Sequence, residues 1–294
     1  MDMQELIAPF ARIIEDICTP SAIRAVEAGG DAAPMWQAFD DSGFLDALVS
    51  EDLGGAGVSL ADAAPLIVLL GHHAVPLPVG DTLIARALLT ASGARAPAGP
   101  IAIATGAGAT PFADVAAHTL LGSPQAPILA SGDDPVNGGQ ALRPIGAVLR
   151  ALLISGASAR VMDMTVAYAN ARNQFGKPIG KQQAVQQQLA ILAEQAVAAR
   201  IAAAIGVRSG LPPHLADAAI AKHGASVAAA QVAAIAHAVH GAIGISEEYD
   251  LHLLTRRLHE WRLADGSEGY WAGLLGERRM AAAAVSTADY IRAG

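Results

Sequence analysis

The amino-acid sequence predicts a mainly α-helical protein with a short β-containing segment near its middle. Alanine, the residue with the highest helix propensity, dominates the composition. Apolar residues recur at helical spacing in the first third of the chain and again throughout the second half. Between these parts lies a stretch with closely spaced prolines and glycines and short apolar runs, which is typical of strands joined by loops.

The N-terminal helical domain is predicted to comprise residues 1–95. The glycine-rich turn from Gly54 to Gly57 ends one helix, and Ser59 with Asp62 three residues later is a favourable start for the next. Residues 96–145 are predicted to form a reduced, β-containing middle segment. We expect its strands at two apolar runs, Ile101-Ala102-Ile103 and Pro127-Ile128-Leu129.

Residues 146–294 are predicted to form an antiparallel four-helix bundle. One helix carries an apolar stripe that includes Ile154 and Val161. Gly210 and Pro212 mark the end of one helix and the beginning of another. The stripes should face the core, and a second alanine-rich face should meet another subunit, because large apolar surfaces rarely stay exposed on a monomer.

The composition argues against several classes of function. The net charge is −8 with 19 Lys and Arg residues, so clustered cations for a nucleic-acid partner are missing. Cys18 is the single cysteine, which fits a reducing compartment, and the acidic start is unlike a signal peptide. Polar residues interrupt each apolar run before the length of a membrane span. We therefore expect a cytoplasmic protein with no nucleic-acid or membrane partner.

No metal site is expected. His237 and His240 are three residues apart and share one helix face, but a metalloprotease helix spaces its histidines four apart with a glutamate after the first. Packing is the favoured interpretation of this pair. His72 and His73 lack the further ligands that a zinc site needs.

The segment Arg172-Asn173-Gln174-Phe175-Gly176-Lys177-Pro178-Ile179 directly follows a predicted helix. A guanidinium pairs with phosphate through its planar fork, Gly176 and Pro178 end the helix, and amides at the next helix start attract anions. The segment therefore predicts a phosphate-binding loop, and a plain connection between two helices is the alternative.

This segment resembles the cofactor-binding segment of the flavin-dependent acyl-CoA dehydrogenase family. Further resemblances follow in the family's order along the chain. They are a helical domain at 36–88, a glycine-rich turn at 240–245, and Asp265-Gly266-Ser267 where most members have a Glu-Gly-Thr catalytic turn. Each motif is weak alone, but their combination in order is specific.

The resemblance implies FAD as the cofactor and an acyl-CoA thioester as the substrate. It implies that Asp265 is the catalytic base and that Arg256 contacts the substrate. It also implies cofactor contacts for Arg172, Gln174, Phe175, Ile179, Gln182, Val239, Gly241 and Ser267.

The middle segment departs from the family. About fifty residues are too few for the family's closed β-barrel, and the Thr-Glu-Pro and Gly-Ser-Asp signature is absent. Such shortened chains resemble subunits of heteromeric acyl-CoA dehydrogenases, known particularly from steroid catabolism. The resemblance thus implies a longer acyl-CoA dehydrogenase subunit as partner in a heterotetramer, with a homo-oligomer as alternative, and an electron-transfer flavoprotein as electron acceptor.

The catalytic turn also departs from the family. Aspartate is one methylene shorter than glutamate, so the Asp265 carboxylate falls about 1.5 Å short of the usual position. Either Asp265 acts as the base, or the chain carries none and is a non-catalytic helical subunit that completes the FAD site of a longer chain. A third interpretation is that Asp265 and Ser267 merely cap a helix.

Overall fold

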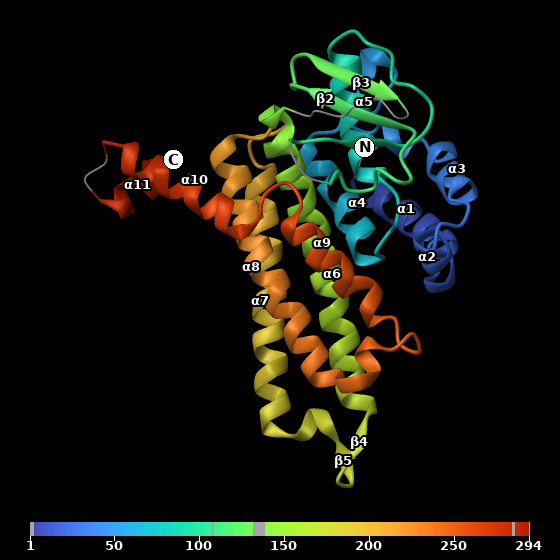
Figure 1. The fold of residues 1–294 in the computed structure, drawn as a ribbon, viewed down its shortest axis with the longest axis vertical. Coiled ribbons are helices and arrows are strands. Elements are labelled where there is room, and N and C mark those ends of the chain that lie inside the picture. Colours follow the sequence, from blue (N-terminus) through green and yellow to red (C-terminus); the bar gives the residue numbers. More distant parts are fainter. Residues whose placement is uncertain (1–2, 107–108, 132–138, 284–285, 294) are drawn as a thin grey trace.

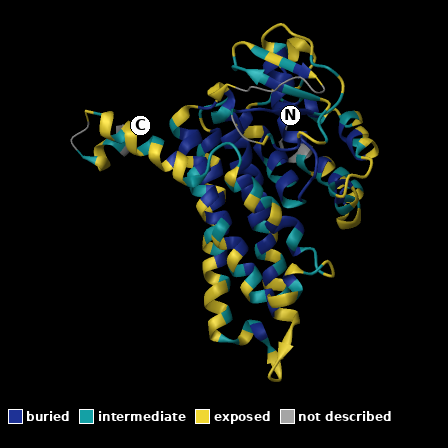
Figure 2. Ribbon diagram, in the orientation of Figure 1, coloured by how far each residue is buried: buried dark blue, intermediate teal, exposed yellow. Residues whose placement is uncertain are grey.

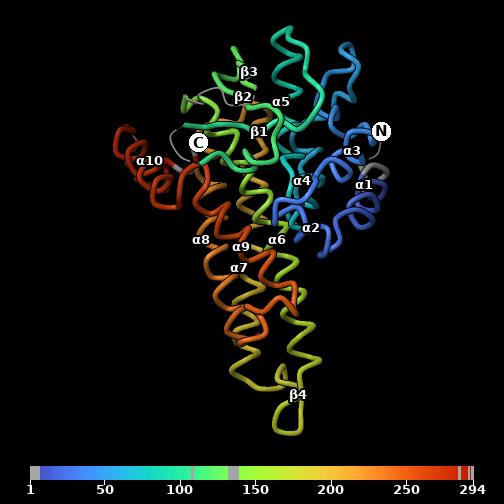
Figure 3. Tube along the Cα trace, turned by 45° about the vertical axis from the view of Figure 1, so that its right-hand side comes forward, coloured from blue at the N-terminus to red at the C-terminus, as the bar shows by residue number. Residues whose placement is uncertain are grey.

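The computed structural model describes residues 3–106, 109–131, 139–283 and 286–293. The N-terminal helices and a small sheet form a head, which lies at one end of a long helical bundle (Figure 1). A short hairpin, which we call the foot, lies at the opposite end of the bundle in both views (Figures 1 and 3). The predicted mainly helical class is confirmed.

The helical part of the head is built around aromatic residues. Phe10 packs against Phe39 and Phe44, with ring centroids 6.0 and 4.9 Å away. As predicted, Ser59 caps the following helix, because its hydroxyl accepts a hydrogen bond from the Asp62 amide at 3.1 Å. The helices are α1 (Met3–Ile17), α2 (Pro20–Glu27), α3 (Ala33–Asp41), α4 (Leu60–His72) and α5 (Val79–Ala91), with the 3-10 turns η1 (Phe44–Asp46) and η2 (Glu51–Leu53).

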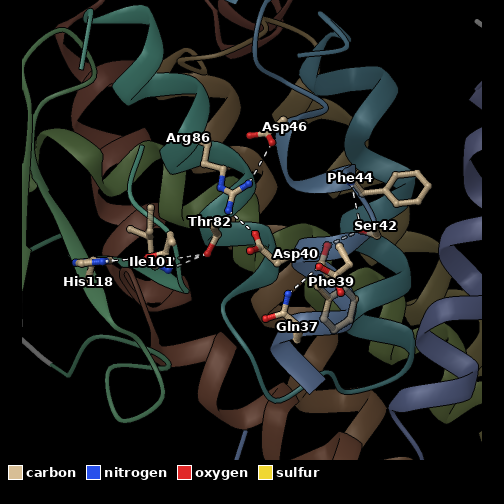
Figure 4. A network of polar contacts seen from close by, with 12 residues as sticks. Gln37, Phe39, Asp40, Ser42, Phe44, Asp46, Thr82, Arg86, Ile101 and His118 are labelled. Atoms are coloured by element: carbon tan, nitrogen blue, oxygen red, sulfur yellow. Dashed lines mark hydrogen bonds and ion pairs between the residues drawn. The ribbon is translucent and has the colours of Figure 1, made fainter. Parts of the chain in front are cut away.

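Polar side chains on α5 fix the head internally (Figure 4). Arg86 donates hydrogen bonds to Asp40 at 2.6 Å and to Asp46 at 3.1 Å. One turn earlier, the Thr82 hydroxyl accepts a hydrogen bond from the Ile101 amide at 2.8 Å. Helix α5 is therefore tied both to the N-terminal helices and to the first strand of the middle segment.

The middle segment contains a three-stranded sheet in its described part. Strand β1 (Ile101–Ile103) pairs parallel with β2 (His118–Gly122), which pairs antiparallel with β3 (Pro127–Ser131). The two apolar runs therefore form strands as expected, whereas β2, with its polar start, was not foreseen. The sheet is open, since its strand order is β1-β2-β3.

The bundle consists of α6 (Arg143–Ala171), α7 (Gln183–Val207), α8 (Leu215–His240) and α9 (Leu251–Leu263), with η3 (Gln140–Leu142) before it. Ile154 and Val161 are fully buried, as their stripe predicts. Helices α10 (Glu268–Ala281) and α11 (Thr287–Ala293) extend away from the bundle (Figure 1).

Helices α4 and α6 cross so closely that glycine is required at the crossing. A Cβ added to Gly71 would lie 2.1 Å from the Leu153 carbonyl oxygen, and one added to Gly156 would lie 1.9 Å from the Val68 carbonyl oxygen. The head and the bundle therefore meet backbone to backbone at this joint.

Three stretches of the described chain are long and apolar enough to cross a membrane by length and composition alone. They are Gln140–Ala171, Gln183–Val207 and Leu215–Ile245. The expectation that no apolar stretch reaches this length was wrong, because alanine keeps the mean hydropathy high despite the polar interruptions. The first window is 83% buried within the chain, whereas the other two are 39% buried, so α7 and α8 present much apolar surface (Figure 2).

Candidate functional site

The residues implied by the sequence lie at two ends of the bundle. Arg172 follows the last residue of α6, while Asp265 lies against its first turn, where a Cβ on Gly146 would come 2.6 Å from the Asp265 carboxyl carbon. A helix rises 1.5 Å per residue, so the span from Gly146 to Arg172 is about 40 Å. Within one chain, the foot and the Asp265 turn therefore cannot reach the same part of one ligand.

The foot is a tight hairpin formed by β4 (Asn173–Gln174) and β5 (Lys177–Pro178), followed by η4 (Ile179–Lys181). Its two turn residues, Phe175 and Gly176, have φ angles of 52° and 77°. Two positive φ values match a type I′ hairpin turn, which a phenylalanine adopts at some energetic cost. Ile179 is buried, and its amide donates to the Arg172 carbonyl at 2.8 Å. This contact fixes where the hairpin leaves the bundle.

The foot presents its polar and aromatic groups to solvent. Phe175 is 91% exposed. Arg172, Gln174 and Lys177 are also exposed, and among the described residues the Arg172 guanidinium forms no ion pair. An unpaired cation beside a free aromatic ring suits a ligand with a phosphate group and a flat ring. These residues therefore fit the nucleotide part of FAD.

The end of α8 lies beside the foot. The Tyr168 hydroxyl of α6 donates to the His240 carbonyl at 3.3 Å, and the two rings stack with centroids 4.4 Å apart. His240 is buried and its pKa is lowered, chiefly by desolvation, so it serves packing as the sequence indicated. Val239 is half-buried, and Gly241 opens η5 (Gly241–Ile245) with a φ of 65°.

Gln182 links the foot to α7. Its backbone is extended, and its side chain is half-buried one residue before the helix begins. Arg172, Gln174, Phe175, Ile179, Gln182, Val239 and Gly241 thus gather at one end of the bundle. Their contacts with a cofactor stay a prediction. Among the described residues, no group of three His, Cys, Asp or Glu side chains could hold a metal ion.

A cavity of about 870 Å³ lies between the head and the upper end of the bundle. Its lining comes from α2, the middle segment, α6, α9 and the turn before α10. The residues that matter for its chemistry are Glu27, Thr105, Phe112, Arg143, Arg256 and Asp265. The Arg256 guanidinium forms an ion pair with Glu27. The implied base and the implied substrate contact therefore border one cavity.

The Asp265 side chain is 3% exposed, and both of its oxygens accept hydrogen bonds. Oδ1 accepts from the Thr105 hydroxyl at 2.5 Å, and Oδ2 accepts from Arg150 Nε at 3.1 Å. The backbone is left-handed here, with φ angles of 58° at Asp265 and 103° at Gly266. Ser267 caps α10, since its hydroxyl accepts from the Tyr270 amide at 3.4 Å, whereas the Asp265 carboxylate points toward Arg150.

Arg150 connects two carboxylates in the interior. It is fully buried and lies 2.6 Å from Asp81 of α5 as well as beside Asp265. Desolvation opposes its charged form, but the two carboxylates outweigh this and raise the pKa of Arg150. Burial in turn raises the pKa of Asp81. This network joins the head, the bundle and the Asp265 turn.

Sequence reasoning missed the structural role of Asp81 and Arg150. The available signal was the placement of a charged residue inside an apolar helical run, Val79–Ala91 for Asp81 and the start of α6 for Arg150. Charged side chains are almost never fully buried unless they are paired, so each should have prompted a search for its partner.

The sequence and structure resemble known proteins. A family model described as "Acyl-CoA dehydrogenase, C-terminal domain" matches residues 145–280. The acyl-CoA dehydrogenase IpdE2 of Mycolicibacterium smegmatis is 30% identical, covering 85% of this chain and 89% of that protein. IpdE2 of Mycobacterium tuberculosis is also 30% identical, over 88% and 91% of the two chains.

Solved structures share the fold. The ChsE4-ChsE5 complex from Mycobacterium tuberculosis has a TM-score of 0.82 at 21% identity, covering 96% of this chain and 98% of that chain. The steroid ACAD Tcur3481-Tcur3483 has a TM-score of 0.79 at 23% identity, over 94% and 97%. The FAD complex of PigA has a TM-score of 0.74 at 16% identity, over 95% and 97%. On the strength of its relatives, the chain belongs to the acyl-CoA dehydrogenase family, whose cofactor is FAD.

Proposed function

We propose that the chain is one subunit of a heteromeric acyl-CoA dehydrogenase, which oxidises an acyl-CoA thioester to its α,β-enoyl form. The observation that carries this proposal is the span of about 40 Å between Arg172 and the Asp265 cavity along α6. One cofactor would not reach both ends of the same chain, so this geometry supports a cofactor site shared between two chains. The short, open sheet of the middle segment favours a longer chain over a second copy as the partner.

The foot is suited to hold the nucleotide part of the partner subunit's cofactor. The Arg172 guanidinium can pair with a pyrophosphate through two parallel hydrogen bonds, and the exposed Phe175 ring can cover a flat ring. When bound, FAD supplies the hydride acceptor. Gln174 can donate to a phosphate or ribityl oxygen from the same hairpin.

The remainder of the site would come from a longer acyl-CoA dehydrogenase subunit. The open sheet of the middle segment would cover less of a bound cofactor than a closed barrel would. In addition, the structurally similar ChsE4-ChsE5 is a complex of two proteins. Helices α7 and α8 offer a surface for assembly, since apolar side chains are exposed on them, namely Ile191, Val197, Ile201, Ile220 and Val227.

The acyl group and the electron acceptor follow from the same proposal. A steroid-type acyl group is supported by the cavity of about 870 Å³ and by the steroid ACAD among the structural neighbours. Electrons would leave the complex through an electron-transfer flavoprotein in the cytoplasm.

A second candidate function is favoured by the geometry of Asp265. A working base needs a free carboxylate oxygen within hydrogen-bond reach of the substrate proton. Here each oxygen already accepts one hydrogen bond, from Thr105 or from Arg150, and the side chain is 3% exposed, so the carboxylate is held toward the protein interior. We propose as the alternative that this chain is non-catalytic, that Asp265 braces the cavity wall, and that the partner subunit supplies the base.

Co-expression with a longer acyl-CoA dehydrogenase chain tests both candidates. The proposal expects a stable complex with fewer flavins than chains, because the cofactor contacts of this chain are one-sided. Activity and full flavin content in a homo-oligomer of this chain would contradict it. Within the complex, Asp265→Asn abolishes turnover if Asp265 is the base and leaves turnover intact if the chain is non-catalytic.

A further inference from the structure

Lys222 of α8 is completely buried, and its ammonium group faces the turn that carries Asp265. The Nζ atom donates to the Arg262 carbonyl at 2.8 Å, to the Gly266 carbonyl at 2.8 Å and to the Ser226 hydroxyl at 3.0 Å. An ammonium has three donors, and here each finds an acceptor. Two of these acceptors are main-chain oxygens on either side of Asp265.

The turn needs such contacts. Helix α9 ends at Leu263, so its last carbonyls have no partner within the helix. Asp265 is a non-glycine residue with a left-handed backbone, which costs energy unless the surroundings hold it. Trp271 assists, because its indole nitrogen donates to the Asp265 carbonyl at 3.2 Å. A cation at the end of α9 also interacts favourably with the helix dipole.

The buried charges near the turn balance when Lys222 is protonated. Asp81 and Asp265 carry two negative charges, while Arg150 and Lys222 carry two positive charges. Burial lowers the pKa of Lys222 to about 7, because it outweighs Asp265 and Glu268, which favour the charged form. The ammonium is therefore the form present below that pH, and it is the form that supplies all three donors.

We infer that Lys222 is a positioning residue that holds the Asp265 turn in its left-handed conformation by binding the carbonyls on both sides of Asp265. The inference rests on the proposed function only in that this turn borders the proposed substrate cavity. The contacts themselves lie within one chain, so neither partner, cofactor nor substrate is needed to test them.

Amide hydrogen exchange of residues 262–268 in the purified full chain is the main test. Lys222→Met keeps an unbranched side chain but removes the three donors, and loss of charged hydrogen bonds should speed exchange in the turn about tenfold or more. Lys181→Met, at the opposite end of the bundle, is the matched control and should leave the turn unchanged. Unchanged exchange in Lys222→Met, or an equal rise throughout α6 and α8, would overturn the inference.

A second measurement uses the wild-type chain, in case Lys222→Met does not fold. Burial lowers the pKa of Lys222 to about 7. The negative charges of Asp265 and Glu268 act against this lowering, whereas the positive charges of Arg150 and Arg262 add to it. At pH 6 its ammonium is therefore present. The chain has three lysines, so ¹⁵N-lysine spectra should show one ammonium whose protons exchange slowly with water and two that exchange fast. Three equally fast signals would contradict the three hydrogen bonds on which the inference depends.

Both measurements use this chain alone, so their outcome does not depend on whether it forms a heteromeric complex. Conversely, a result showing that the turn does not depend on Lys222 would not bear on the proposed cofactor role of the foot.

Discussion

The two ends of the bundle satisfy their charged groups in opposite ways. At the cavity end, Asp81, Arg150, Asp265 and Lys222 are buried and bind one another or nearby carbonyls and hydroxyls. At the foot, Arg172 is exposed without an ion pair among the described residues. The buried charged groups already have partners within this chain. The exposed cation of the hairpin has none in the described part of the chain, so it is available to bind another molecule. The comparison separates residues whose charges are paired within this chain from an exposed cation that we propose acts on a second chain.

The largest expected effect is the loss of the cation at the cavity end. Arg150→Met would leave the Asp81 and Asp265 carboxylates buried against each other, and we expect the free energy of unfolding to fall by about 3–5 kcal/mol. Urea unfolding measures this. Adding Asp81→Asn should recover part of the loss. As a control, Arg278→Met, at an exposed position of α10, should change stability by less than about 0.5 kcal/mol. A loss below about 1 kcal/mol in Arg150→Met would mean that this network does not stabilise the chain.

At the foot, the same kind of substitution should affect binding and not folding. Arg172→Ala in the complex should lose about 1.5–3 kcal/mol of FAD affinity, roughly tenfold or more, with unfolding unchanged. Flavin titration and urea unfolding of the same preparation distinguish the two effects. Unchanged flavin retention would refute the role of Arg172, and Arg278→Ala provides the control.

The protonation of Lys222 makes the cavity end sensitive to pH. The pKa of Lys222 is about 7 in the folded chain, whereas a solvated lysine side chain, as in the unfolded chain, has a pKa of 10.5. Between pH 7 and pH 10.5 the unfolded chain therefore binds a proton that the folded chain lacks. The free energy of unfolding should therefore rise with pH over this window, by about 1.4 kcal/mol per pH unit at most. Lys222→Met should flatten this slope. Parallel slopes in the two proteins would show that Lys222 does not titrate in this range.

The smallest effect concerns an ion pair at the edge of the cavity end. Glu268 pairs with Arg262, whose side-chain hydrogen bond is the main cause that lowers the pKa of Glu268. A carboxylate with a lowered pKa stabilises the fold above its ordinary pKa, and that stability is lost as the pH falls. Glu268→Gln should therefore cost about 0.5 kcal/mol at pH 7 and nothing in strong acid. A constant difference between pH 3 and pH 7 would exclude this origin.

Local features of the fold could be predicted from the sequence. Ser59 with Asp62 specified a helix start, and the apolar run at Ile101 specified a strand, because the deciding contacts lie within a few residues. The paired state of Asp265 could not be predicted in this way. Its partners, Thr105 and Arg150, are 160 and 115 residues away in the sequence, and no local pattern records such a distance.

The break between α6 and α7 at the foot could be predicted because it depends on one short segment. Arg172, Phe175 and Gly176 are neighbours, so the cation, the aromatic ring and the turn are fixed together. The same reasoning overlooked the apolar length of α7 and α8. That reasoning considered each polar interruption separately, whereas the many alanines keep the mean hydropathy of each whole helix high.

The crossing at Gly71 and Gly156 has a mechanical consequence for the assembled protein. Where two helices touch main chain to main chain, there is no flexible side chain between them to absorb sliding or rotation. Helices α4 and α6 should therefore move together as one rigid body. A displacement of the foot by a neighbouring subunit should then also move the head. The segment after β1 would follow, because Thr105 joins it to the Asp265 turn while the Ile101 amide joins β1 to Thr82 of α5.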